Sequence, residues 1–405
     1  MSLPKEVPFT YEALSQIELK NGVIELQVGP AHAGSGHMRI VVWVEGDTVV
    51  KVDPDIGYVH RGVEKLSEDR IYIKAIPIVE RPALVDTVNA NLAYVIALEK
   101  LLGLEAPPRA QYIRVITAEI SRIISHLYGI AIFGIFMGSS TVFMWALADR
   151  EPFIDIMEEL TGARITYSHI IPGGVRWDLP KDFADRLEIA LQYLERRMKD
   201  YEGIWIKNPV VEARTKGVGT LSATRAVELG VVGPNLRASG VGYDVRKDSP
   251  YAAYPDFDFE VPTLSEGDSY ARLLIRVEEI KQSISIIRQA LKKIPQGRVI
   301  YEDYYKRMSP LMKKIYDETG RVKFTSLVTS LSPPKGEAIS RVEGGRGEVF
   351  YYLVSDGGKT PYRFRAVTPS FRNLPYFTHV MPGHKLADVP VIYGSIDYFP
   401  PEADR

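Results

Sequence analysis

The chain of 405 residues contains no cysteine. This absence excludes disulfides, thiolate nucleophiles, cysteine-bound zinc and any iron–sulfur or nickel–iron centre that the chain would itself ligate through sulfur. The motifs GxxxxGK[ST], HExxH and GxGxxG are also missing, and no Ser–His–Asp order stands out. Any redox role of this protein therefore depends on a cofactor that is held elsewhere.

An excess of charge of one sign is lacking as well. The 50 lysines and arginines nearly balance the 51 acidic residues, and the basic residues are dispersed along the chain. Such a chain has no long-range field for a polyanion, so we expect no binding of nucleic acid. The first 16 residues contain no basic segment followed by an apolar one, which predicts a protein on the cytosolic side without a secretory signal.

Charge is also missing locally, because residues 123–148 contain no Asp, Glu, Lys or Arg. The stretch is long enough to span a membrane. His126, three glycines and a Ser-Ser-Thr run interrupt it, however, and no second span accompanies it. We therefore predict a helix or a helix pair that is buried inside a bundle.

The pattern of apolar residues predicts an α+β fold. It consists of an N-terminal antiparallel β region, a central multi-helix bundle and a small C-terminal α/β region. The clearest helix has Leu273, Val277, Ile280 and Ile284 on one stripe, a cap at Ser265 or Asp268, and an end at Pro295. The expected segments are 1–61 (β region with a histidine loop), 62–207 (helical bundle), 208–263 (loops with short strands), 264–296 (long bundle helix) and 297–405 (linker and α/β region).

Two motifs carry candidate chemistry. The loop GPAHAGSGHMR places His32 and His37 five residues apart, where they could bind a metal or transfer protons; the alternative is a glycine turn whose histidines cap the backbone. The segment HRGVEKL begins a helix and contains Arg61, whose permanent charge could face an anion or a reduced centre. For the second motif the alternative is a solvated helix start, which the local sequence favours.

Two further segments, residues 170–180 and 235–251, combine paired small residues with Arg237, Asp244 and Arg246. They predict a tightly folded, buried polar connection.

An ordered set of blocks extends the interpretation beyond these motifs. The blocks are GPAHAGSGHMR, GYVHRGVEKL, EAPPRAQYIRVITAEISRIISHL, LTGARITYSHIIPGGVRWDLP, LRASGVGYDVRKDSPY, GDSYARLLIRVEEIKQSISII, RGEVFYYLVSDGGKTPYR and DYFPPEADR. Together they resemble the D-type (large catalytic) subunit of respiratory complex I. The same blocks are similar to archaeal methanophenazine-reducing enzymes, membrane-bound sulfane reductases and, more distantly, the large subunits of nickel–iron hydrogenases.

The resemblance implies a subunit that ligates no cofactor itself. It would dock beside a B-type iron–sulfur subunit, with C-type, I-type ferredoxin-like and H-type membrane subunits as further partners. A [4Fe–4S] cluster in the B-type subunit would pass electrons to a quinone-type acceptor in a cleft between the two chains. Arg61 matches the family arginine near that cluster, and His37 or His32 matches the histidine that contacts the acceptor.

The chain departs from the family pattern at the acceptor site. Leu84 takes the place of the tyrosine that donates to the quinone, and Phe136 takes the place of the aspartate that pairs with the histidine. Thr166 occupies the position of a histidine beside the terminal cluster, with His169 three residues further on. Leucine and phenylalanine line a pocket but donate no proton.

The hydrogenase relatives imply a second site. Their metal cysteines correspond here to Ala83, Asp86, Phe399 and Glu402, which excludes a nickel–iron centre on ligand chemistry. Asp86 and Glu402 would face one former cavity, where two close carboxylates raise at least one pKa. They are candidate proton-relay residues.

The alternative for these two carboxylates is a pair of structural salt bridges to Arg81 or Lys65.

The leading hypothesis is a peripheral subunit on the cytoplasmic face of the cell membrane, in an NADH (or other donor):quinone oxidoreductase that couples electron transfer to ion translocation. One alternative is a subunit of a related sulfane or polysulfide reductase, which would account for the apolar Leu84 and Phe136. The other alternative is a degenerate structural scaffold.

Overall fold

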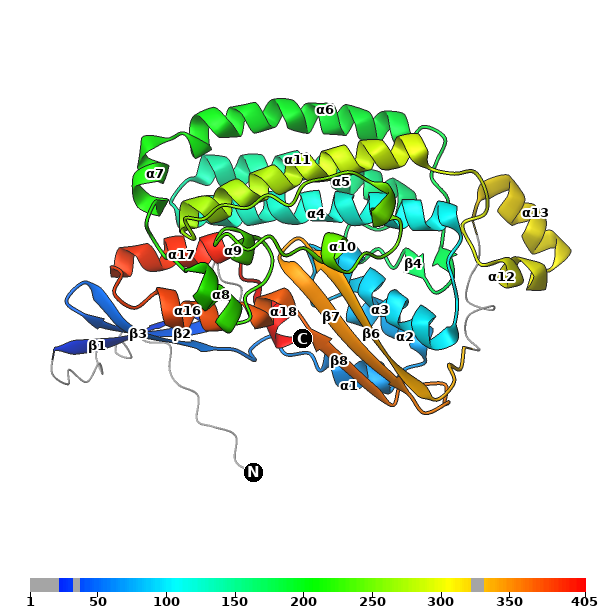
Figure 1. The fold of residues 1–405 in the computed structure, drawn as a ribbon, viewed down its shortest axis with the longest axis horizontal. Helices are drawn as coiled ribbons and strands as arrows, with labels where there is room; N and C mark the ends of the chain where they lie inside the picture. Colours follow the sequence, from blue (N-terminus) through cyan, green and yellow to red (C-terminus); the bar gives the residue numbers. More distant parts are fainter. Residues whose placement is uncertain (1–21, 32–36, 322–330) are drawn as a thin grey trace.

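The computed structural model describes residues 22–31, 37–321 and 331–405. Near one end of the molecule lies an antiparallel sheet of β1 (Val23–Val28), β2 (Arg39–Glu45) and β3 (Thr48–Asp55), in that order (Figure 1). Ile40, Val41, Val42 and Val44 of β2 and Val49 and Val52 of β3 are buried, and Gly46 turns the β2–β3 hairpin with a φ of 63°. The predicted N-terminal β region is confirmed.

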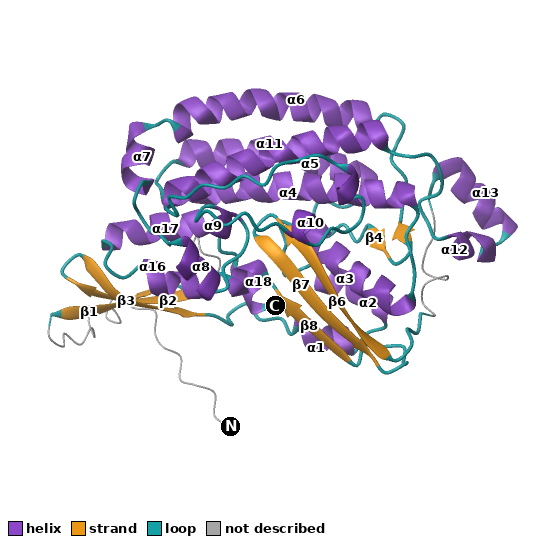
Figure 2. Ribbon diagram, in the orientation of Figure 1, coloured by secondary structure: helices purple, strands orange, loops and turns teal. Residues whose placement is uncertain are grey.

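Long helices that run side by side form the centre of the molecule (Figure 2). They are α4 (Pro108–Phe136), α5 (Ser140–Thr161), α6 (Phe183–Tyr201) and α11 (Ser269–Lys293). The side chain of Asp268 caps α11 by accepting a hydrogen bond from the Ala271 amide at 2.8 Å, and Leu273, Ile280 and Ile284 of the predicted stripe are buried. The predicted bundle is confirmed.

The uncharged stretch is a helix pair, because α4 ends at Phe136 and α5 begins at Ser140. Among the described residues, only the α4 helix is long and apolar enough to cross a membrane. The most apolar segment of α4 is 89% buried inside the molecule. The long helix therefore belongs to the core, as predicted, and α5 packs beside it.

A second antiparallel sheet belongs to the C-terminal region. It contains β6 (Gly336–Gly344), β7 (Gly347–Ser355) and β8 (Arg363–Val367), and α3 (Thr87–Leu102) packs on β6 and β7. The chain ends in short helices that lie between the two sheets in Figure 1. They are α15 (Pro369–Arg372), α16 (Pro375–Val380), α17 (Val389–Ile396) and α18 (Pro400–Asp404).

Two segments differ from the sequence prediction. Residues 208–263, all of which are described, contain short helices where we expected short strands, because Ser and Asn caps start helical turns between the glycines. The segment expected to be a linker contains α12 (Glu302–Arg307) and α13 (Pro310–Thr319), the latter capped by Ser309. The remaining elements are α1 (Val63–Glu68), α2 (Tyr72–Val79), β4 (Ile170–Ile171), β5 (Gly174–Val175), α7 (Pro209–Thr215), α8 (Ala223–Glu228), α9 (Pro234–Arg237) and α10 (Val245–Asp248).

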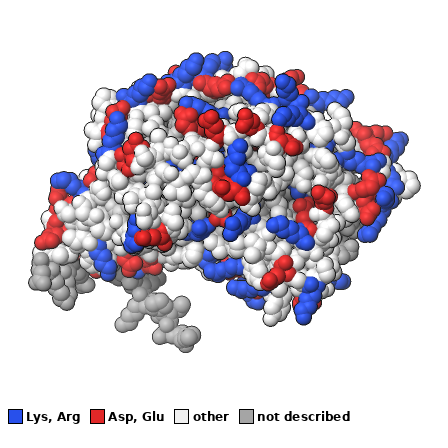
Figure 3. All heavy atoms as spheres, viewed as in Figure 1, with Lys and Arg blue, Asp and Glu red and all other residues white. Residues whose placement is uncertain are grey.

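The visible surface mixes both signs of charge. Figure 3 shows acidic and basic side chains interspersed over the face that it presents, with no single-sign stripe. The main apolar core lies between the bundle, α3 and the β6–β8 sheet, and a second core joins the N-terminal sheet to α16 and α17. The junction of these two cores brings residues from both ends of the chain together.

Candidate functional site

Asp86 lies at the start of α3, between α4 and the turn that joins β6 to β7. Its side chain is 3% exposed and accepts hydrogen bonds from the Asn89 amide at 2.7 Å and the Ser121 hydroxyl at 2.8 Å. The backbone amide of Gly345 donates a third hydrogen bond at 2.7 Å. A Cβ atom at Gly344 would lie 2.8 Å from the Asp86 Oδ2 atom, so the turn approaches this closely only with glycine there.

Glu402 lies on α18 and is 2% exposed. The Ser370 hydroxyl donates a hydrogen bond to its carboxylate. Burial raises the pKa of Glu402 to about 7, and the negative charges of Asp86 and Asp397 act in the same direction, while Arg346 opposes them. Asp86 and Glu402 therefore belong to one electrostatic site, and Glu402 holds or releases a proton near neutral pH.

Arg346, at the β6–β7 turn, supplies the positive charge of this site. Its Nε atom donates to the Asp397 carbonyl at 3.0 Å, and its Nη2 atom donates to the Asp397 carboxylate at 3.2 Å. The guanidinium also lies 5.0 Å from the ring centre of Phe399. The Arg276 Nε atom on α11 is 4.0 Å from the other Asp397 oxygen. We call Asp86, Asp397, Glu402, Arg276 and Arg346 the carboxylate cluster.

The salt bridges considered from sequence are absent from the described contacts of Asp86 and Glu402. Lys65 pairs instead with Glu68 at 3.3 Å, and Arg81 is an exposed residue. Asp86 is held by uncharged donors because it is buried on the α4 side of the loop, whereas Arg81 faces the surface. The positive charge that we expected from Lys65 or Arg81 is supplied to Glu402 by Arg346 instead.

An apolar pocket of about 380 Å³ lies between the N-terminal sheet, the end of α4 and α17. The ring of Phe136 meets the ring of Tyr393 edge to face at 5.0 Å, and both residues line the pocket. The other lining residues are Val28, Met38, Ile40, Ile135, Leu386, Val389 and Pro390. The pocket suits a flat apolar group, since most of its exposed lining is apolar.

His37 directly precedes the pocket residue Met38. It is exposed and has a φ of 81°, an uncommon conformation for a residue with a side chain. His32, the other candidate of this loop, lies outside the described residues. His37 is therefore adjacent in the chain to a pocket residue, but it is not itself among the described lining residues.

Tyr393 connects the pocket to the carboxylate cluster. Burial raises the pKa of Tyr393, and the nearby Tyr128 and Asp397 raise it further. Gly394 follows in α17, and a Cβ atom there would meet Phe136 at 3.1 Å, so α17 packs tightly against α4. The pocket wall and the cluster therefore meet at α17.

The segment ERPALVD joins α2 to α3 and carries the remaining candidates. The Arg61 Nη2 atom donates to the Arg81 carbonyl at 3.1 Å, and burial together with the charge of Arg81 lowers the pKa of Arg61. Arg61 itself is exposed, Ala83 is buried and Leu84 is half-buried. Two cations thus lie close together on one surface, where an anionic or reduced partner group would be stabilised.

Residues 166–169 pack against the same segment. Thr166 has a φ of 48°, and the neighbouring Ser168 donates its amide and hydroxyl hydrogens to Glu80 at 3.0 and 2.6 Å. His169 is 1% exposed and stacks on Trp177, and neither of its ring nitrogens has a hydrogen-bond partner among the described residues. Burial lowers the pKa of His169 to about 3, so the imidazole is neutral.

Sequence reasoning missed four charged residues. Arg276, Arg346 and Asp397 complete the carboxylate cluster, and burial raises the pKa of Glu80 to about 7. A signal was available for Arg346, since it follows two glycines in a sharp hairpin turn. Among the described residues, no group of three or more His, Cys, Asp and Glu side chains is arranged to hold a metal ion.

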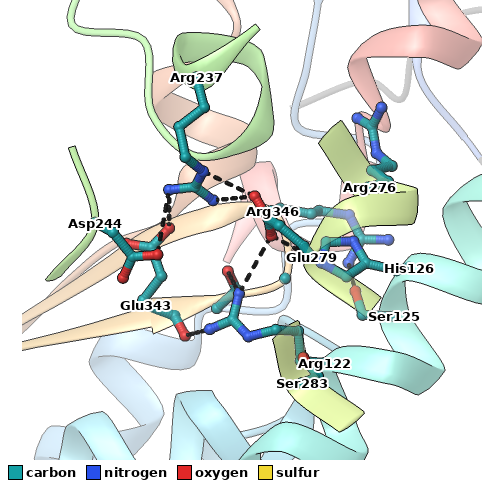
Figure 4. A network of polar contacts seen from close by, with 12 residues as sticks. Arg122, Ser125, His126, Arg237, Asp244, Arg276, Glu279, Ser283, Glu343 and Arg346 are labelled. Atoms are coloured by element: carbon teal, nitrogen blue, oxygen red, sulfur yellow. Dashed lines mark hydrogen bonds and ion pairs between the residues drawn. The ribbon is translucent and has the colours of Figure 1, made fainter. Parts of the chain in front are cut away.

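The polar connection predicted for Arg237, Asp244 and Arg246 is confirmed. All three are at most 1% exposed, and Arg246 contacts Asp244 at 2.6 Å. Figure 4 shows this region beside Arg346, with Arg237 directed at Glu279 and Glu343.

Comparison with known proteins identifies the family. Residues 137–405 match the family described as the 49 kDa subunit of respiratory-chain NADH dehydrogenase. A D-type subunit of the NADH-quinone oxidoreductase of Thermodesulfovibrio yellowstonii is 39% identical over 94% of this chain and 96% of its own length. NADH-quinone oxidoreductase subunit 4 of Thermus thermophilus is 38% identical over 99% of this chain and 98% of its own length.

The chain belongs to the 49 kDa subunit family. It is a subunit of an oxidoreductase complex of the complex I type, as the resemblance implied. A solved structure of similar fold comes from an archaeal membrane-bound sulfane sulfur reductase, with a TM-score of 0.87 and 36% identity over 96% of this chain and all of that chain. Membership of the family implies partner subunits and association with a membrane-bound complex.

Proposed function

We propose that this D-type subunit forms one wall of the acceptor cavity of a membrane-bound oxidoreductase, with a quinone-type molecule as acceptor. The observation that carries the proposal is the apolar pocket lined by Met38, the residue after His37, and by Tyr393, whose hydroxyl is influenced by Asp397 of the buried cluster that contains Glu402. The ring of the acceptor would lie against Phe136 and Tyr393. His37 would donate a hydrogen bond to its polar edge.

Electrons would come from a [4Fe–4S] cluster in a B-type iron–sulfur subunit, because this chain has no cysteine with which to ligate one. Arg61 and Arg81 offer adjacent positive charges on the surface near Leu84, and Thr166 and His169 lie behind that surface. Their role would be to stabilise the reduced cluster of the partner. We place the partner's cluster against this surface.

Protons for the reduced acceptor would come from the carboxylate cluster. Glu402 has a pKa of about 7 and so changes its protonation near neutral pH, and Asp86 lies close enough to influence that pKa. The hydroxyl of Ser370 and the amide of Gly345 hold the two carboxylates in place. Asp86 and Glu402 are thus proton-supplying groups, and electron transfer is coupled to ion translocation in the membrane part of the assembly.

The further partners in this proposal are C-type, I-type ferredoxin-like and H-type membrane subunits, and the complex lies on the cytoplasmic face of the cell membrane. The face shown in Figure 3 has mixed charge and no basic patch for anionic lipid, and we propose that the membrane contact is made through other subunits. We expect release from membranes only within a detergent-solubilised complex. Recovery of the chain as a free soluble monomer would contradict this placement.

The test measures how fast a quinone reoxidises the reduced cluster in the purified complex. The His37→Ala and Asp86→Asn variants should slow this rate, since one removes an acceptor contact and the other removes an ionisable group from the carboxylate cluster. His379→Ala is the matched control, because His379 is an exposed histidine on α16 that contacts Arg225. Unchanged rates in both site variants would disprove the assignment.

Reduction of polysulfide is the second candidate function. The similarity in fold to the sulfane sulfur reductase and the apolar Leu84 and Phe136 support it. Turnover with polysulfide but not with quinone would select this alternative. Cluster reoxidation by neither acceptor would instead favour a structural scaffold.

A further inference from the structure

A network of buried charges fills the space between α4, α11 and the start of the β6–β7 turn (Figure 4). We call it the ion-pair network. Its charged members are each at most 1% exposed, and they comprise three arginines and four carboxyl groups. They are Arg122, Arg237 and Arg246 with Glu119, Asp244, Glu279 and Glu343.

The composition of this network leaves one carboxyl group in excess. Arginine keeps its charge in proteins, so the three guanidinium groups balance three carboxylates, while the neighbouring Arg276 is counted with Asp397, which it approaches at 4.0 Å. A fourth buried carboxylate without a counter-charge is strongly unfavourable, and such a group takes up a proton instead. The network therefore holds one proton at neutral pH, either on a carboxyl group or on His126, which contacts Glu279 at 2.9 Å.

Three of the carboxyl groups have good ionic partners. The Glu279 carboxylate accepts a hydrogen bond from the Nε atom of Arg237 at 2.8 Å, and the Nη2 atom of Arg237 lies 2.7 Å from it. The Asp244 carboxylate accepts hydrogen bonds from two nitrogens of Arg246 at 3.0 and 2.6 Å. Glu119 lies 3.1 Å from Arg246 and 3.4 Å from Arg122, and it also accepts hydrogen bonds from two hydroxyl groups. These contacts favour the ionised form of each group.

Glu343 is the least well paired of the four. Its Oε1 atom lies 2.9 Å from the Nη1 atom of Arg237, which is already the partner of Glu279, and its Oε2 atom accepts only the Val245 amide at 3.1 Å. Arg122 donates to the backbone carbonyl of Glu343 and not to its carboxyl group. The surplus proton therefore belongs on Glu343.

His126 is the competing position for that proton. Its ring is completely buried, its Nδ1 atom has no described partner, and burial lowers its pKa despite the contact with Glu279. For Glu343, burial raises the pKa to about 7. Asp244 acts in the same direction, whereas Arg237, Arg122 and Arg246, which face Glu343 from the neighbouring elements, act against it. The lowered pKa of His126 and the raised pKa of Glu343 both agree with the pairing geometry.

We propose that Glu343 is a second proton-holding site of this subunit, linked to Glu402 across the ion-pair network. The link runs from Glu343 to Arg237 and Glu279, then along α11 from Glu279 to Arg276, which lies 4.0 Å from Asp397. Asp397 contacts Arg346, which attracts Glu402. Glu343 and Arg346 also belong to the same β6–β7 connection, three residues apart.

The consequence is a coupling of opposite sign between the two sites. When Glu402 takes up a proton, the negative charge near the network falls, which lowers the pKa of Glu343 and favours loss of its proton to water. The interior then keeps a constant total charge while a proton is bound at one place and released at the other. This coupling rests on the proposed function of Glu402, whereas the protonation of Glu343 does not.

Infrared difference spectra of the whole purified complex, recorded across a pH titration, test the proposal. Glu343→Gln should remove one band of a protonated carboxyl group at neutral pH. Glu348→Gln is the matched control on the same hairpin, since two arginines contact Glu348, and it should keep the band. Glu402→Gln should move the Glu343 titration to lower pH. If Glu343→Gln does not assemble, Glu343→Asp is the second variant, and it should keep a protonated carboxyl band but shift its frequency.

Two results would overturn the proposal. The first is a Glu343→Gln spectrum identical to that of the unmodified complex. The second is the loss of an imidazolium band in the His126→Gln variant, which would show that the surplus proton lies on His126 and not on a carboxyl group. If Glu343 titrates at the same pH in the Glu402→Gln variant as in the unmodified complex, the link between the two sites is rejected. The function proposed for the acceptor pocket fails separately, through quinone reoxidation rates that His37→Ala leaves unchanged while the Glu343 band persists.

Discussion

The apolar pocket and the carboxylate cluster meet at α17 but differ in chemistry. The pocket has about 380 Å³ of space and a lining dominated by apolar side chains, with no carboxylate among its described lining residues. The cluster is fully buried, and it combines Asp86, Asp397 and Glu402 with two guanidinium groups. In the function that we propose, the pocket binds the acceptor and the cluster holds a proton.

This difference teaches how a redox site can separate binding from proton supply. Phe136 lines the pocket with an apolar ring, and the proton chemistry that we propose lies behind the pocket wall, where burial raises the pKa of Glu402 to about 7. Arg346 keeps the cluster from carrying three uncompensated negative charges.

Removal of Arg346 should have the largest effect. Arg346→Leu leaves Asp86, Asp397 and Glu402 with one distant guanidinium, and loss of one partner from a buried ion pair costs about 3–5 kcal/mol. We expect failure of the subunit to assemble, measured by native electrophoresis of solubilised membranes. Arg341→Leu is the control, because Arg341 is half-exposed on the same hairpin and its ion pair is worth about 1 kcal/mol or less. Normal assembly of Arg346→Leu would contradict the account.

The pH dependence of stability should reveal Glu402. Its pKa of about 7 in the folded protein lies above its ordinary value of 4.5, so the fold favours the protonated form. Stability from this group is present below about pH 4.5 and is lost as the pH rises through about 7. Glu402→Gln should therefore raise the unfolding temperature of the complex at about pH 8, by an amount equivalent to about 3 kcal/mol, and should change it little at about pH 5.

An equal effect of Glu402→Gln at both pH values would show that the carboxyl group is not the one that titrates. Ser370 can still donate a hydrogen bond to the amide oxygen of glutamine, so the variant keeps the local packing.

Neutralisation of Asp86 should act on turnover. Asp86→Asn keeps the shape of the side chain and removes an acid–base group beside Glu402, which we expect to lower kcat for the acceptor by about a hundredfold. KM should stay constant, since Asp86 does not line the pocket. Steady-state kinetics in membrane vesicles measure both constants. A raised KM with unchanged kcat would mean that Asp86 binds the acceptor.

Truncation of Phe136 should weaken binding of the acceptor, and this effect should be smaller than the effect of Asp86→Asn on kcat. Phe136→Ala removes the edge-to-face contact with Tyr393 and widens the pocket. We expect KM for the acceptor to rise about tenfold with kcat nearly unchanged. Phe143→Ala removes a half-buried aromatic side chain from α5, away from the pocket lining, and serves as a control for general loss of packing. A pocket variant that lowers kcat alone would contradict the division of roles.

The sequence predicts those helices and strands that have a regular apolar repeat or a local signal such as a helix cap or a turn. The α11 stripe and its cap at Asp268, the β2–β3 hairpin and the buried α4 helix follow from periodicity and from residues close in the chain. The helices α12 and α13 escaped prediction because they are short and partly exposed, although Ser309 and Pro310 are a normal helix start.

The site was predictable only in part, for a different reason. Resemblance to the family placed Asp86 and Glu402 in one region, and the electrostatic contact between them agrees. Arg346 and Asp397 join them through contacts between distant parts of the chain, and no local pattern records such contacts. The protonation that we propose for Glu343 could not be predicted from the sequence either, because it follows from a count of charged groups that only the folded chain brings together.

The most direct test of separate binding and proton supply is the double variant Phe136→Ala/Glu402→Gln, compared with both single variants for acceptor kcat/KM in the same membranes. Independent sites give additive free-energy changes. We predict that the losses of the single variants multiply in the double variant, with the KM effect of one and the kcat effect of the other both retained. A double variant no slower than the worse single variant would show that pocket and cluster act as one unit, contrary to this account.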